Sequence, residues 1–146
     1  MFERIVAAID DDAFRRKRVI EATRELAAAR QSTVTVAHIL ELERRAATGR
    51  PTTITAAPPR LEDEALAKAL VEEALAALRE AGVNAKGVVR SGGGSPTAKE
   101  LLSIAGEADA DLIIVGDRGA HLSDLLLGGV AYRIVHAARC PVLLVR

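Results

Sequence analysis

The chain has 146 residues; 49% are hydrophobic, only 2% are aromatic, and 20 Lys and Arg balance 20 Asp and Glu. This apolar content excludes global disorder, and the length suits a single domain over residues 1–146. Zero net charge argues against a dedicated nucleic-acid or membrane-surface binder, because such a protein needs a basic excess. Scarce aromatic residues also remove the stacking platforms that bind single-stranded nucleic acids.

Cysteine content and the N-terminal residues indicate the cellular compartment. Cys140 is the only cysteine, which excludes an intrachain disulfide and a multi-cysteine zinc site. The first residues lack the basic segment, long apolar segment and cleavage site of a secretory leader. No window approaches the roughly 20 apolar residues that span a bilayer. We therefore expect a cytoplasmic protein that does not enter a membrane.

The hydrophobic pattern alternates between strands and helices. Buried parallel strands are short apolar or β-branched runs, whereas helices carry apolar residues three and four positions apart. In chain order, the sequence predicts a strand over 4–10, a helix over 12–30, a strand over 32–40, a helix over 61–81, a strand over 83–89, a helix over 96–108, a strand over 111–116, a helix over 128–138 and a strand over 140–145. Residues 41–60, rich in Pro and Thr, are expected to form a long flexible surface loop.

Several residues mark the ends and inner faces of these helices. Asp12 and Arg30 suit the two ends of the first helix dipole, and Gly82 stands where a helix-ending glycine belongs. Ser95 is expected to cap the third helix, with Pro96 at its first position. The predicted inner faces comprise Val19, Ala22, Leu26 and Ala29, then Leu61, Leu66, Leu70, Leu75 and Leu78, then Ala98, Leu101, Leu102 and Ala105.

Strands alternating with helices predict an α/β fold: a five-stranded, parallel, doubly wound sheet with helices on both faces. Such sheets bind ligands beyond the carboxyl ends of the strands, where the strand order reverses. The segments that follow the first and fourth strands are Asp10-Asp11-Asp12 and Gly116-Asp117-Arg118-Gly119. We expect the functional site there.

Glycines follow the fourth strand and precede the next helix. Gly116 and Gly119 lie in the loop, and Gly128 and Gly129 open the helix. Glycine lets a backbone approach a ligand closely, and a helix N-terminus presents N–H groups to an anion. These residues could cradle phosphates without a lysine, or they could simply form turns and a helix start. Their spacing leaves both interpretations open.

Asp10, Asp11 and Asp12 also allow two interpretations. Three clustered carboxylates could hold Mg²⁺ or Mn²⁺, and without a cation they would repel a triphosphate. Asp11 and Asp12 could instead cap the first helix, which is the more ordinary arrangement. The three histidines share no metal-ligand spacing, and His38 is expected to pack at the end of its strand.

Several stretches resemble the universal stress protein family. They are Asp111 to Gly119 (DLIIVGDRG), Leu125 to Ala131 (LLLGGVA) and Ala138 to Val145 (ARCPVLLV), with Ile5 to Asp10, Val36 to Ile39 and Gly94 to Pro96 upstream. The resemblance covers essentially the whole chain apart from residues 41–60. It implies a Rossmann-like fold of the adenine nucleotide alpha hydrolase-like kind.

The resemblance also implies a function: a stress-response or regulatory protein that binds an adenine nucleotide, ATP, with or without Mg²⁺. It assigns adenine and ribose to Asp10 and to the backbone around Ala8, Ile9 and Ile39, the adenine slot to Val115, and the phosphates to Gly116, Gly119, Gly128, Gly129 and Val130, with added charge from Arg118. It implies no catalytic residue.

The phosphate motif departs from the family pattern. ATP-binding members carry Gly-x-x-Gly, nine residues, then Gly-Ser or Gly-Thr; here eight residues separate Gly119 from Gly128. The sequence context favours Gly128 as the family glycine, so Gly129 replaces the hydroxyl residue. One hydrogen bond to a charged group contributes about 1.5–3 kcal/mol, so its loss weakens binding about tenfold or more.

Two other functions therefore stay open. The chain could be a non-nucleotide-binding member of the family that acts as a dimeric protein-interaction module. It could also be a weak metal-dependent nucleotide hydrolase that uses the three aspartates. In either case Pro141 to Val145 would form an apolar edge strand. Two copies that pair there would form a symmetric homodimer, as the resemblance also implies.

Overall fold

The structure, a computed structural model, describes residues 1–41, 63–93, 95–117 and 129–146. Its elements are β1 (Arg4–Ala8), α1 (Ala13–Arg30), β2 (Thr33–Leu40), α2 (Glu64–Glu80), β3 (Asn84–Ser91), α3 (Thr97–Glu107), β4 (Leu112–Gly116), α5 (Val130–Ala137) and β5 (Val142–Val145). None of the helices in the described ranges is long and apolar enough to cross a membrane. The predicted 41–60 loop lies almost entirely outside these ranges.

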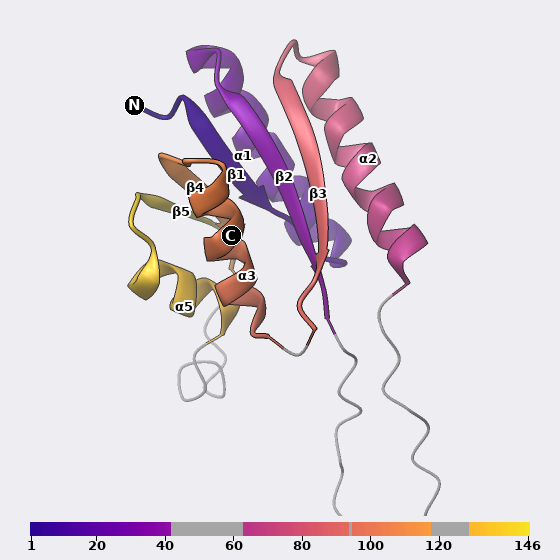
Figure 1. Ribbon diagram of the computed structural model, residues 1–146. Helices are drawn as coiled ribbons and strands as arrows, with labels where there is room; N and C mark the ends of the chain where they lie inside the picture. The colour runs from indigo at the N-terminus through magenta and orange to yellow at the C-terminus, as the bar shows by residue number, and fades with distance from the viewer. Residues whose placement is uncertain (42–62, 94, 118–128) are drawn as a thin grey trace, which may run out of the picture.

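The five strands form one parallel sheet in the order β3-β2-β1-β4-β5 (Figure 1). From β1 the chain moves first to one side of the sheet, through β2 and β3, and then to the other, through β4 and β5. The strand order therefore reverses between β1 and β4. The predicted fold class is confirmed, and the reversal lies between the two strands whose ends were expected to carry the site.

Helices cover both faces of the sheet, and each face has its own hydrophobic cluster. One cluster joins the sheet to α1 and α2, with Val19, Leu75 and Leu78 at its centre. The other joins the sheet to α3 and α5, with Leu101 and Ile134 at its centre. Successive strand residues point to opposite faces, so each strand supplies both clusters.

The predicted inner faces are confirmed for α3 and need correction for α1 and α2. Ala29 is exposed, because α1 turns Val19, Ile20, Thr23 and Ala27 toward the sheet instead. Leu66 on α2 is 54% exposed. The sheet-facing positions near Leu66 are Ala67 and Val71, since α2 packs closely where β3 carries Gly87. A Cβ built on Gly87 would collide with Val71 Cγ1.

The start of α3 also differs from the prediction. The Pro96 carbonyl accepts hydrogen bonds from the N–H groups of Lys99 and Glu100, so Pro96, not Ser95, is the capping residue. Pro96 has ψ of 135°, an extended conformation outside the helix. Ser95 instead closes a turn, with its N–H donating to the Gly92 carbonyl at 2.7 Å.

The end of α2 follows the prediction. Gly82 follows the last helical turn with φ of +75°, a left-handed conformation that glycine adopts without strain.

Candidate functional site

The candidate site lies at the carboxyl edge of β1, β2 and β4. Ala8, the last residue of β1, stands between Ala37 of β2 and Val115 of β4 in the strand register. The Ile9 N–H continues this pairing by donating to the Ala37 carbonyl at 2.9 Å. The residues that follow β1 therefore emerge beside Gly116, the last residue of β4.

The sheet face under α3 and α5 supplies an aliphatic wall at this edge. Ala8, Ile39 and Val115 are 7%, 4% and 5% exposed and belong to one cluster, against which Val130 of α5 packs. Four expected adenine or phosphate residues are thus brought together. The side chain of Ile9 belongs to the opposite cluster, so only its backbone is available on this side.

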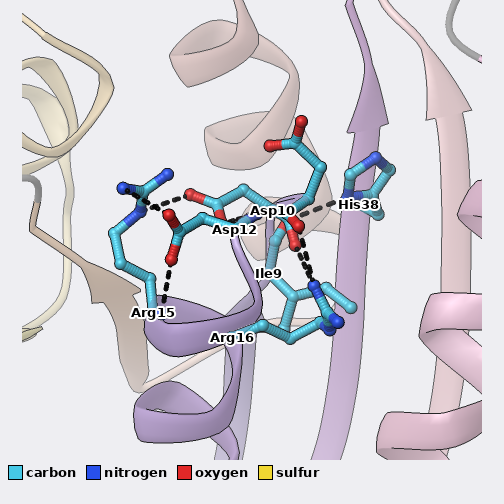
Figure 2. A network of polar contacts seen from close by, with 7 residues as sticks. Ile9, Asp10, Asp12, Arg15, Arg16 and His38 are labelled. Atoms are coloured by element: carbon cyan, nitrogen blue, oxygen red, sulfur yellow. Dashed lines mark hydrogen bonds and ion pairs between the residues drawn. The ribbon is translucent and has the colours of Figure 1, made fainter.

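His38 fixes the backbone that leaves β1. Its imidazole is 3% exposed, and Nδ1 lies 3.0 Å from the Ile9 carbonyl oxygen (Figure 2). The expectation that His38 packs at the end of its strand is confirmed. The contact links the ends of β1 and β2 just before the chain turns into the aspartate segment.

The carboxylates of Asp10 and Asp12 are turned toward the first turn of α1 (Figure 2). Asp12 caps the helix, because its side chain accepts a hydrogen bond from the Arg15 N–H at 2.8 Å. Asp10 Oδ1 accepts from the Asp12 N–H at 3.0 Å, and Oδ2 accepts from Arg15 Nε at 2.8 Å. Arg15 Nη1 also lies 3.5 Å from Asp12 Oδ2.

The side chain of Arg16 binds the backbone of the same turn. Its Nη1 donates to the carbonyl oxygens of Asp10 and Asp11, at 3.1 Å each. Asp11 is exposed. The capping interpretation is therefore confirmed for Asp12. Within the described ranges, no three His, Cys, Asp or Glu side chains are arranged to hold a metal ion.

Gly116 lets α1 approach the end of β4. A Cβ built on Gly116 would lie 3.3 Å from Arg15 Cβ and 3.4 Å from Val19 Cγ2, which is tighter than most such contacts. The next residue, Asp117, continues the pairing with β5 through its N–H and the Val145 carbonyl at 2.8 Å. Its carboxylate accepts from Arg146 Nε at 3.1 Å.

α5 begins at Val130, whose side chain packs against the same cluster as Ala8 and Val115. Gly129 is its capping residue, with φ of −54° and no side-chain capping hydrogen bond. The Gly129 carbonyl accepts from the Arg133 N–H at 3.0 Å, so the N–H groups of the first three helical residues have no partner within the helix. Arg118, Gly119 and Gly128 lie outside the described residues.

Sequence reasoning missed the role of Arg15. The segment Arg15-Arg16-Lys17-Arg18 suggests a solvated basic face. The side chain of Arg15 is only 19% exposed, and it contacts both Asp10 and Asp12. A signal was present in the spacing, because Arg15 follows Asp12 by three positions, as partners on one helix face do.

Comparison with known proteins identifies the family. The model of the universal stress protein family matches residues 1–146. Universal stress protein YxiE of Bacillus subtilis is 30% identical over 153 aligned positions, covering all of both chains.

Solved structures agree on the fold. A universal stress protein in complex with cAMP superposes with a TM-score of 0.76 at 20% identity, covering 99% of this chain and 97% of the other. The universal stress protein from Archaeoglobus fulgidus in complex with dAMP gives a TM-score of 0.69 at 24% identity, covering 100% and 98%. From the family match and the full-length similarity, we conclude that this chain belongs to the universal stress protein family.

Proposed function

We propose that this protein binds an adenine nucleotide, ATP, beyond the carboxyl ends of β1 and β4, and acts in a stress response or its regulation. The observation that carries the proposal is the aliphatic wall at the reversal of strand order. Ala8, Ile39 and Val115 form it, and Val130 extends it. Doubly wound sheets bind ligands at this position.

Two related structures support the choice of ligand. Structural neighbours of this chain were solved with cAMP and with dAMP, both of which carry adenine and phosphate. In the present chain, adenine would pack on aliphatic side chains and backbone. Asp10 follows β1 at the same edge and, as the family resemblance implies, would meet the ribose.

The phosphates would meet backbone N–H groups. The first turn of α5 offers those of Val130 and its neighbours, which are free of helical partners. Gly129 has no Cβ to obstruct the approach, and Gly116 closes β4 beside this turn. Gly119, Gly128 and Arg118 would complete the phosphate site, as the family resemblance implies. The motif is degenerate, because Gly129 supplies no hydroxyl.

Co-purification tests the proposal. The protein is purified without added nucleotide and denatured, and the supernatant is examined for ATP, ADP and AMP. A thermal shift is then measured with ATP, with and without Mg²⁺, because a ligand that binds only the folded state raises its stability. We expect bound adenine nucleotide or a concentration-dependent shift. If both are absent, the chain does not bind ATP.

A second function, a dimeric protein-interaction module, is favoured by the exposed edge of the sheet. β5 is the last strand of the sheet, and its Leu144 is 39% exposed. Tyr132 and Val135 of α5 are 52% and 44% exposed. We propose a homodimer that pairs through β5, because an unpaired apolar edge favours association.

Sedimentation at several protein concentrations tests the dimer. We expect a dimer in the wild-type protein and a shift toward monomer for Leu144→Lys, which places a charge on the edge strand. Lys86→Ala is the control, because this exposed side chain belongs to β3, at the opposite edge of the sheet. A wild-type monomer at all concentrations would contradict the proposed homodimer.

A further inference from the structure

Arg15 occupies the space between the carboxyl ends of β1 and β4. Its stem packs on Gly116, since a Cβ built there would lie 3.3 Å from Arg15 Cβ and 3.5 Å from Arg15 Cδ. Its guanidinium reaches back across the turn to Asp10 at 2.8 Å and Asp12 at 3.5 Å (Figure 2). With only 19% of the side chain exposed, the cation is fixed at the reversal of strand order.

The same edge has an electrostatic problem if it binds phosphates. The carboxylates of Asp10 and Asp12 stand beside the end of β4, close to where the proposed function brings the phosphates. Anionic groups so close together repel a polyphosphate unless a cation lies between them. Many phosphate sites solve this with a divalent cation held by carboxylates. In this chain a guanidinium contacts both carboxylates.

We propose that Arg15 takes the place of a metal cation at this edge: it offsets one of the two negative charges of Asp10 and Asp12, so the site accepts the phosphates of an adenine nucleotide without Mg²⁺. This inference rests on the proposed function and adds to it a positioning residue that sets the preference for a phosphorylated nucleotide over adenosine. Arginine remains protonated throughout the physiological pH range, so its compensation is permanent.

The rest of the basic segment differs in its contacts. Arg16 donates to the backbone carbonyls of Asp10 and Asp11 and thereby shapes the turn. Lys17 and Arg18 are exposed, and Lys17 Nζ lies 3.9 Å from Glu21. Arg18 therefore offers a matched control: its replacement removes the same charge from the same helical turn without reaching the carboxylates of the edge.

Calorimetric titration with ATP and with adenosine, each in EDTA and in MgCl₂, tests the inference. We expect wild-type protein to bind ATP with similar affinity in both buffers. Arg15→Gln is expected to lose on the order of tenfold in ATP affinity in EDTA, with adenosine affinity nearly unchanged. Mg²⁺ should restore part of that loss. Arg15→Lys and Arg18→Gln should both stay near wild type.

Three results would overturn the inference. A strict requirement of the wild-type protein for Mg²⁺ is the first, and it needs no variant to fold. Equal losses of ATP and adenosine affinity in Arg15→Gln would show a merely structural role. Wild-type protein that binds neither ligand would refute the proposed function itself, which separates that failure from a failure at Arg15.

Discussion

At each end of the sheet a carboxylate accepts hydrogen bonds beside β1, but the donors differ between the two ends. At the amino end, the Asp111 carboxylate before β4 accepts hydrogen bonds from the backbone N–H groups of Glu3 and Arg4, at 2.9 Å each. At the carboxyl end, the Asp10 carboxylate accepts from the Asp12 N–H and from the Arg15 side chain. Each carboxylate joins the start or end of β1 to a neighbouring element.

The difference lies in what the donors can do. At the amino end, the donors are backbone N–H groups at the start of β1, and they help to lower the pKa of Asp111. Burial raises the pKa of this carboxyl, but the N–H groups of Glu3 and Arg4 outweigh it and bring the pKa below its usual value. At the carboxyl end one donor is instead the Arg15 guanidinium, whose positive charge can also offset that of a bound anion. The amino end fastens the fold, whereas the carboxyl end is suited to binding.

The largest expected effect on stability comes from removing the hydrogen bonds that Asp111 accepts at the amino end. Asp111→Ala removes the acceptor of two backbone N–H groups. We expect a loss of about 2 kcal/mol in the free energy of unfolding, after allowance for partial exposure. Urea denaturation measures it. Asp109→Asn is the control: asparagine tolerates the left-handed backbone at this position (φ of 47°), the side chain is 90% exposed, and the lost ion pair with Arg4 should contribute little. Equal losses in the two variants would contradict the comparison.

At the carboxyl end, restoring the hydroxyl group of the family motif should strengthen ATP binding. A Cβ built on Gly129 meets no atom of the described residues within 4 Å, so Gly129→Ser is expected to fit against them without rearrangement. We expect ATP affinity to rise about tenfold, because the hydroxyl can donate to phosphate. Gly129→Ala, which adds the same Cβ without the hydroxyl, should leave affinity near wild type. Unchanged affinity in the serine variant would refute the register that equates Gly129 with the Ser/Thr position.

A smaller effect separates the two aspartates at the start of α1. Asp12→Ala removes the helix cap and one partner of Arg15, and we expect a loss of about 1 kcal/mol in stability. Asp11→Ala should be nearly neutral, because that side chain is exposed. Thermal denaturation of the two variants checks the order. A larger loss for Asp11→Ala would show that the capping assignment is wrong.

The smallest effect is the pH dependence at the amino end. Since folding lowers the pKa of Asp111, its stabilisation is present above the pKa of the unfolded chain and is lost as the pH falls through the folded value. We expect Asp111→Asn to be less stable than wild type by about 0.5–1 kcal/mol at neutral pH, since the amide oxygen keeps one hydrogen bond.

Urea denaturation of the wild type and of Asp111→Asn at a series of decreasing pH values tests this sign. The difference between the free energies of unfolding of the wild type and Asp111→Asn should narrow as the pH falls. A difference that widens on acidification would contradict the assigned direction.

The fold was largely predictable because β1, β2, β4 and β5 are short apolar or β-branched runs and α2 and α3 have a regular apolar spacing. Errors arose where local rules competed with packing. Leu66 lies four positions before Leu70, but the buried stripe of α2 runs through Ala67 and Val71, one residue further around the helix, and leaves Leu66 exposed. Ser95 is a good capping residue, but Pro96 follows it in an extended conformation and takes the cap position.

The site was only partly predictable. Parallel strands place their carboxyl ends together, so the proximity of Ala8, Ile39 and Val115 followed from topology. The contacts of Arg15 did not, because they depend on the angle at which α1 leaves β1 and on the missing side chain of Gly116. A basic segment read without that geometry resembles any solvated helix face. The charge balance of zero hides this local pairing of Arg15 with Asp10 and Asp12.

Titration of the ¹⁵N-labelled protein with ATP, followed by amide chemical shifts, tests the central claim most directly. The account predicts that the largest changes occur in Ala8, Ile39, Val115 and Val130 at the carboxyl edge. The amides of Glu3 and Arg4, which hold Asp111, should serve as an internal reference and change little. Saturating changes centred on the amino end, or no saturable change anywhere, would contradict the account.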